Sequence, residues 1–142
     1  MSPGAAADAP DLGPLLDPAH LVVARLPTGW QPAQPIDGFS AVIDDGNETT
    51  LVCSEAALGE IGADVTESEH GWRRITFAGP LPWELVGFLA DVAGRLAAAR
   101  IPLAAMAGFT TDHVLVRAAH ADLAVAVLSG QPPPPRRIGV AP

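Results

Sequence analysis

Short apolar runs, separated by polar, glycine and proline residues, recur between residues 18 and 130. Alternating or continuous apolar runs of about four to eight residues are typical of strands, whereas apolar positions spaced three and four apart are typical of helices. On this basis the sequence predicts strands at residues 21–26, 39–43, 49–53, 72–77, 103–107 and 114–117. It predicts helices at residues 54–61, 83–100 and 121–128.

Turn and capping residues support several of these boundaries. The Asp-Asp-Gly-Asn cluster at residues 44–47 predicts a hairpin turn between two strands. Ser54 is a favoured N-cap for the first helix, and Gly62 a favoured stop. Pro82 favours a helix beginning at about residue 83, because proline at the first helical position loses no hydrogen bond. Gly87 would then fall in the first turn of that helix.

The order of elements predicts the fold class. From residue 72 the chain reads βαββα, which lacks the final strand of the ferredoxin-like βαββαβ unit. The N-terminal half lacks its first helix and has a long loop there instead. We therefore expect an α+β fold of two ferredoxin-like halves, residues 18–70 and 71–130, with antiparallel sheets and helices packed on one face. The strand at residues 21–26 would supply the missing edge strand of the C-terminal half.

Both ends of the chain differ in composition from this region. Residues 1–17 are rich in Ala, Pro, Gly and Asp and lack periodicity, which predicts a disordered leader. Residues 131–142 are rich in proline and predict an exposed tail. Deleting both segments should leave the melting midpoint nearly unchanged.

Composition narrows the class of partner. The net charge is −8, and all eight basic residues are arginine, so binding to nucleic acid and to anionic membrane surfaces is disfavoured. No apolar run reaches the roughly 18–20 residues that span a bilayer, and the N-terminus lacks the features of a signal peptide. The single cysteine, Cys53, cannot form an internal disulfide. These observations favour a cytoplasmic protein.

Two residues between Trp83 and Val116 suggest a ligand site. A helix N-terminus at Gly87 can hold an anion, because its first N–H groups lack intrahelical acceptors and the helix dipole is positive there. Asp112, in a turn between two strands, can hold a cation. A free α-amino acid carries both charges. The alternatives are close packing of the helix at Gly87 and a turn carboxylate at Asp112 that binds its own backbone.

The same stretch resembles the CASTOR-type ACT domains, a family of small amino-acid-sensing proteins. Residues 84–88 (Glu-Leu-Val-Gly-Phe) correspond to a Ser-Leu-Thr-Gly-Ile-like helix start in that family, and residues 48–53 (Glu-Thr-Thr-Leu-Val-Cys) to Glu-x-Ser-x-Val-Cys. Residues 107–116 correspond to Ser-Thr-x-x-Thr-Asp-Tyr-x-Leu-Val, whose Thr-Asp-x-x-Leu-Val part is the most specific. The chain departs from these motifs at residues 84–86, at Ala107-Gly108, and at His113, which replaces the tyrosine.

The resemblance implies roles for six residues. Asp112 would accept the α-ammonium group of an amino acid, and the backbone around Val86 and Gly87 would bind its carboxylate. Phe109 and Thr111 would line the pocket, and Thr50 would approach from the other half. From the residues alone, Phe109 is equally a core aromatic, Thr111 a turn residue and Thr50 a β-branched strand residue.

The predicted function is a non-enzymatic, amino-acid-binding regulatory sensor, with its ligand, a free amino acid or similar small zwitterion, at the junction of the two halves. It would need no cofactor, and we expect a homo-oligomer. The alternative is an ACT-type interaction or oligomerisation module without a ligand. The sequence contains no evident nucleophile–base pair, and the spacing of His113 and His120 does not suit a metal site. Cys53, in an apolar strand, is more typical of inert core.

Overall fold

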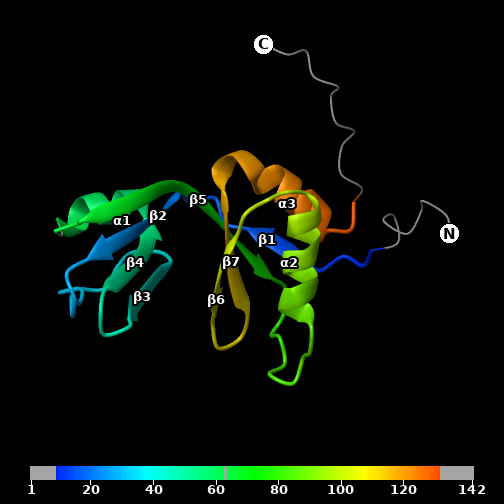
Figure 1. Cartoon of the computed structure of the whole chain (residues 1–142), viewed down its shortest axis with the longest axis horizontal. Coiled ribbons are helices and arrows are strands. Elements are labelled where there is room, and N and C mark those ends of the chain that lie inside the picture. The colour runs from blue at the N-terminus through cyan, green and yellow to red at the C-terminus, as the bar shows by residue number, and fades with distance from the viewer. Residues whose placement is uncertain (1–8, 63, 132–142) are drawn as a thin grey trace, which may run out of the picture. The chain divides into compact units, whose positions relative to one another are not determined.

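The computed structural model describes residues 9–62 and 64–131 (Figure 1). Its strands are β1 (Pro14–Leu16), β2 (Leu21–Leu26), β3 (Ser40–Asp44), β4 (Thr49–Ser54), β5 (Glu67–Phe77), β6 (Ala104–Ala107) and β7 (Asp112–Arg117). Its helices are α1 (Glu55–Ile61), α2 (Phe88–Ala98) and α3 (Ala121–Leu128), and a single 3₁₀ turn (Ala118–His120) precedes α3. The strands follow the order β3-β4-β2-β5-β7-β6, and β1 also pairs with β5. The fold is α+β and ferredoxin-like, as predicted.

The chain divides into two compact units that share the long strand β5. The N-terminal unit comprises residues 17–74, and the C-terminal unit includes the described residues 9–16 and 75–131. β2 pairs with the first part of β5, where Leu21 lies opposite Trp72. β1 pairs with the last part, where Leu16 lies opposite Ile75. β5 has 11 residues, against six in the predicted strand, and this extra length gives each unit a strand.

The N-terminal unit has the ferredoxin-like strand order without the first helix. Residues 27–39 form a loop in place of that helix, as the sequence predicts. The side chain of Ser54 caps α1 by accepting the Ala57 N–H at 3.0 Å, and Gly62 ends it with φ 63°. Apolar side chains from one face of the sheet, from α1 and from this loop pack together. This cluster comprises Val22, Leu26, Leu51, Cys53, Ala57, Trp30, Ile36, Leu58, Ile61 and Val65.

The C-terminal unit has the strand order β1-β5-β7-β6, with α2 and α3 packed on one face. Its buried core comprises Ile75, Phe77, Val92, Leu96, Ile101, Val114, Val116, Ala121, Ala124 and Leu128. β1 supplies the edge strand that the βαββα order of this unit lacks. The prediction that residues 21–26 supply it is wrong, because that segment stays between β4 and β5 of the N-terminal unit.

The prediction of a disordered leader is wrong for its described part, residues 9–17. The Leu12 N–H donates to the Leu128 carbonyl at 2.9 Å, and Arg95 donates to the Pro10 carbonyl at 2.7 Å. Leu12 and Leu16 both pack against the C-terminal core. Leu12 and Leu16 lie among prolines and glycines, and they form too short a pattern to predict a strand. Their packing against the core holds the strand in place. Residues 1–8 and 132–142, the rest of the predicted leader and nearly all of the predicted tail, lie outside the described residues.

Candidate functional site

The site begins where α2 starts, one turn later than the sequence predicts. Gly87 is the N-cap of α2, with a left-handed φ of 84°, and its carbonyl accepts the Asp91 N–H at 2.9 Å. The prediction of a helix that begins at residue 83 is therefore wrong. Pro82 and Leu85 close an isolated turn, in which the Leu85 N–H donates to the Pro82 carbonyl at 3.1 Å.

The left-handed backbone explains the glycine at position 87. A Cβ there would meet nothing within 4 Å, so the conformation, rather than close packing, favours glycine. Glycine also offers no side chain to cap the helix, and no side-chain cap bond is formed. The N–H groups of the first turn, at Phe88, Leu89 and Ala90, have no acceptors within the helix. This end of α2 can accept an anionic group.

The second part of the site is the hairpin turn between β6 and β7. The Gly108 N–H donates to the Thr111 carbonyl at 2.9 Å, which closes the turn, and Ala107 lies opposite Asp112. The turn is tied to the loop before α2, because the Leu81 N–H donates to the Thr110 carbonyl at 2.7 Å. Backbone hydrogen bonds therefore connect the two segments that carry Gly87 and Asp112.

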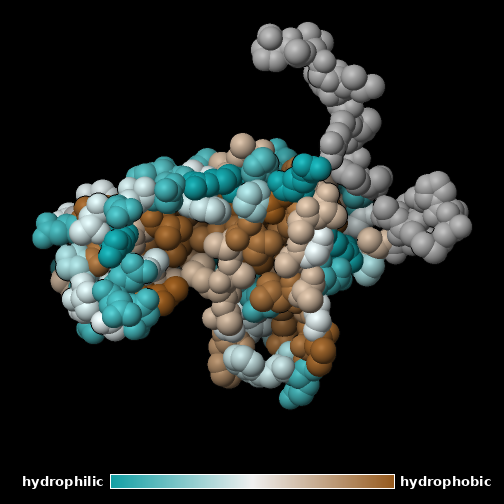
Figure 2. Space-filling model, viewed as in Figure 1, coloured by the Kyte–Doolittle hydropathy of each residue, from teal (hydrophilic) through white to brown (hydrophobic). Residues whose placement is uncertain are grey.

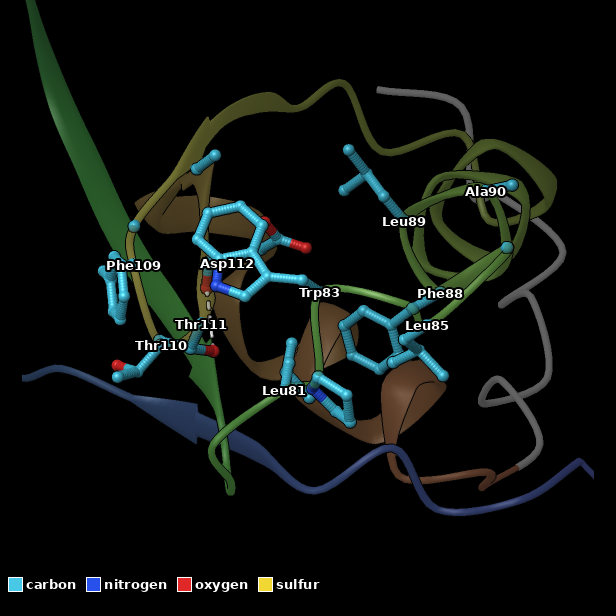
Figure 3. Close-up of a pocket in the computed structure, with 14 residues that line it drawn as sticks. Leu81, Trp83, Leu85, Phe88, Leu89, Ala90, Phe109, Thr110, Thr111 and Asp112 are labelled. Carbon is cyan, nitrogen blue, oxygen red and sulfur yellow. Dashed lines mark hydrogen bonds between the residues drawn. The ribbon is translucent and has the colours of Figure 1, made fainter.

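The two segments line a pocket of about 300 Å³ within the C-terminal unit (Figure 3). Residues from the loop and α2 form one side: Leu81, Pro82, Trp83, Leu85, Gly87, Phe88, Leu89 and Ala90. Residues 107–112 of the hairpin form the other. This volume lies at the lower end of the range for small-molecule sites, which is roughly 300–1,000 Å³.

Asp112 is the one charged side chain among the residues that line this pocket. Its side chain is half-buried at the start of β7, and Figure 3 shows it pointing toward the middle of the pocket. Among the described residues, no hydrogen-bond or ion-pair partner contacts its carboxylate. The prediction's alternative, a turn carboxylate that binds its own backbone, therefore has no support in the geometry.

Apolar side chains surround the mouth of the pocket. Trp83 and Phe109 are 69% and 82% exposed and stack edge-to-face, with ring centroids 5.5 Å apart. Leu85 and Leu89 are also exposed. Figure 2 shows apolar surface over the start of α2 and its preceding loop. Exposed apolar residues gathered in this way mark sites of ligand or protein contact more often than scattered ones do.

The structure brings together four of the six predicted site residues. Gly87, Phe109, Thr111 and Asp112 all line the pocket. The Val86 side chain is 93% exposed and does not line it. Thr50 belongs to β4 of the N-terminal unit, where it lines a different, smaller pocket that also includes Arg25 and Glu48.

The apolar residues on the α2 side are not among the predicted site residues. A helix at residues 83–100 would instead place Leu85 and Leu89 on one apolar face together with Val92 and Leu96. The isolated turn and the left-handed Gly87 instead leave Trp83 and Leu85 exposed at the pocket. The Pro-Leu-Pro-Trp segment at residues 80–83, which three residues separate from Gly87, was the available signal.

Neither a metal site nor a reactive thiol finds support among the described residues. Across residues 9–62 and 64–131, no three His, Cys, Asp or Glu side chains come close enough to hold a metal ion. Burial in β4 raises the pKa of the Cys53 thiol, which favours its unreactive protonated form. In the described part of the chain, no helix is long and apolar enough to cross a membrane.

Comparison with known families identifies the segment that carries the pocket. Residues 67–130 match the ACT domain family. This segment contains both the α2 N-terminus and the β6–β7 turn. The match is to ACT domains in general; the CASTOR-type subfamily remains a resemblance. No curated protein matches the sequence.

Several solved structures share the fold of this chain. A protein from Agobacterium tumefaciens is 25% identical with a TM-score of 0.72, over 87% of this chain and 92% of that one. A Vibrio cholerae protein of unknown function, described as a possible transport protein, is 21% identical with a TM-score of 0.70, over 85% and 90%. The ligand-free regulatory subunit of aspartate kinase from Thermus thermophilus is 15% identical with a TM-score of 0.55, over 82% and 94%.

Proposed function

We propose that this protein is a regulatory sensor whose ACT domain binds a free amino acid in the pocket between α2 and the β6–β7 turn. The observation that carries the proposal is that the N-terminus of α2 and the Asp112 carboxylate line the same pocket. The two groups have opposite electrostatic character. A zwitterion is the small molecule that satisfies both.

The binding mode follows from these two groups. The α-carboxylate accepts N–H groups of Phe88, Leu89 and Ala90, where the helix dipole favours negative charge. The α-ammonium group donates to Asp112. Hydrogen bonds that involve a charged partner typically contribute about 1.5–3 kcal/mol each. Phe109 and Thr111 line the hairpin side, which is the position that the resemblance implies for them.

The fold of the similar structures supports a regulatory role. One of them is the regulatory subunit of a kinase, solved without its ligand. A protein of this kind signals through a change in stability or association, because a ligand at 100 times its Kd stabilises the folded state by about 2.7 kcal/mol. Contact of Thr50 with the ligand, a homo-oligomer and a cytoplasmic location remain predictions from the sequence. Replacing Thr50 with valine tests the first, and sedimentation with and without ligand tests the second.

The experiment is a thermal-shift screen against the proteinogenic amino acids, followed by calorimetry with the best ligand. Asp112→Asn keeps the size of the side chain but removes its charge, so the Kd should rise roughly tenfold or more. Asp122→Asn is the matched control, since it removes the same charge from an exposed position on α3, outside the pocket. Equal affinity of the Asp112 variant and the unmodified protein would overturn the assigned role.

A second function, an interaction module without a ligand, is favoured by one observation. Trp83, Val86 and Phe109 are more exposed than is usual for large apolar residues. Self-association that persists when no amino acid raises the melting midpoint would support this function. Loss of self-association in a Val86→Asp variant would assign it to this surface.

A further inference from the structure

The chemistry of the pocket lining bears on which amino acid binds. Apart from Asp112, the lining consists of apolar side chains, glycines, one proline and the hydroxyls of Thr110 and Thr111. Its large apolar side chains are Leu81, Trp83, Leu85, Phe88, Leu89 and Phe109. No lysine, arginine, histidine or second acidic residue belongs to this lining.

The apolar residues lie on both sides of the mouth, beyond Asp112. Trp83 comes from the loop before α2 and Phe109 from the hairpin, and their rings are in edge-to-face contact. Figure 3 shows Leu89 projecting from α2 into the space between helix and hairpin. A side chain extending from a ligand held at Asp112 would therefore meet carbon atoms from two elements.

We propose that the pocket selects amino acids with uncharged, apolar side chains; this inference rests on the proposed function. The two α-substituents of the ligand use Asp112 and the α2 N-terminus. A charge on the side chain would then lose water and find no partner, which is costly. An apolar side chain instead removes its own surface and that of Trp83, Leu89 and Phe109 from water.

The volume supports a single amino acid rather than a larger molecule. At about 300 Å³ the pocket is small for a cofactor or peptide, and its mouth already exposes apolar side chains that a ligand side chain would cover. The fit is by surface burial rather than by specific hydrogen bonds. Selectivity among apolar side chains should therefore be modest, because one methylene changes binding by only about 1–3 kcal/mol.

The test compares matched ligands by calorimetry on the unmodified protein. Lysine is norleucine with an added terminal ammonium group, and norvaline and glutamate differ by a terminal methyl or carboxylate. We expect the apolar member of each pair to bind at least roughly tenfold more tightly. Quenching of Trp83 fluorescence, lost in Trp83→Phe, should report the same order.

A variant pair tests the lining directly. Leu85→Arg places a cation in the lining at a half-exposed position, and should raise glutamate affinity relative to norvaline at least fivefold. Val86→Arg adds the same charge one residue away, outside the lining, and should leave the ratio nearly unchanged. If both variants change the ratio equally, the lining does not determine selectivity.

The outcomes separate this inference from the proposed function. If lysine or glutamate binds as tightly as its apolar partner, the selectivity is overturned, while an affinity loss in Asp112→Asn would still support the amino-acid site. If the apolar ligand is preferred but Asp112→Asn binds it equally well, the assigned ammonium partner is wrong and the apolar selectivity holds. If no amino acid binds, both are overturned.

Discussion

At the scale of single residues, Gly108 and His113 are physically linked. A Cβ at position 108 would lie 2.7 Å from Nε2 of His113 and 2.8 Å from the Thr111 carbonyl oxygen. Both positions depart from the motif that the sequence resembles, which has Thr and Tyr there. The histidine ring occupies the space that a side chain at position 108 would need, so the two departures belong together.

Alanine substitutions at Gly108 and at Gly94 should have opposite effects on the free energy of unfolding. Gly108→Ala should lower the free energy of unfolding by about 1–3 kcal/mol, because the Thr111 carbonyl is fixed by the turn hydrogen bond and cannot move away. Gly94→Ala, in the middle of α2 with open space around it, should raise the free energy of unfolding by about 0.5–1 kcal/mol. Urea unfolding measures both. An unchanged Gly108→Ala protein would contradict the turn geometry.

Asp17 gives the N-terminal unit a pH dependence. The Ala19 N–H donates to its carboxylate at 2.8 Å and lowers its pKa most; partial burial opposes this, and the Arg74 guanidinium lowers the pKa further. Because the pKa is lower in the folded state, the stabilisation is present above the ordinary value near 3.8 and is lost as the pH falls through the folded pKa.

The substitution Asp17→Asn should therefore reduce the free energy of unfolding at pH 7 and flatten its decline below about pH 4. The asparagine oxygen can still accept the Ala19 N–H, but the charge that strengthens this bond and the charge interaction with Arg74 are both removed. Denaturant unfolding at a series of pH values checks this, with Asp122→Asn as control. A variant curve parallel to that of the unmodified protein would exclude Asp17 as a source of the pH dependence.

At the scale of elements, the sequence predicts most strands and helices but not how two of them are used. α1 and α3 have nearly the predicted bounds. For α1 the reason is local, because the Ser54 cap and the Gly62 stop are signals within the sequence. α2 begins later because Gly87 adopts a left-handed conformation, and a glycine at that position is equally compatible with a helical first turn. β1 depends on tertiary burial of Leu12 and Leu16, which no local pattern contains.

Because β1 is part of the sheet, removing residues 9–17 should lower the melting midpoint, whereas the sequence predicts almost no change. A chain beginning at residue 18 should melt roughly 10 °C or more below one beginning at residue 9. It loses the pairing of β1 with β5 and the packing of Leu12 and Leu16, each worth about 1.5–3 kcal/mol if fully buried. Thermal unfolding by circular dichroism measures the difference. Equal midpoints would show that β1 adds nothing to the C-terminal unit.

At the scale of the whole molecule, the overall charge and the pocket lining both disfavour anionic ligands. The chain carries a net charge of −8, which disfavours anionic molecules at long range. A zwitterion with an apolar side chain has no net charge, so this field neither attracts nor repels it. Recognition then depends on two opposite local charges. The sequence predicts the residues that carry them, and the hydrogen bond from Leu81 to Thr110 connects the two segments on which they lie.

The most direct test measures whether Asp112 recognises the ammonium group. Calorimetry should compare the best amino acid with its deaminated analogue, the same carboxylic acid without the α-amino group, on the unmodified protein and on Asp112→Asn. We predict that the unmodified protein prefers the amino acid by roughly tenfold or more and that this preference largely disappears in Asp112→Asn. The same preference in both proteins would contradict the central claim, that Asp112 and the α2 N-terminus together bind a free amino acid.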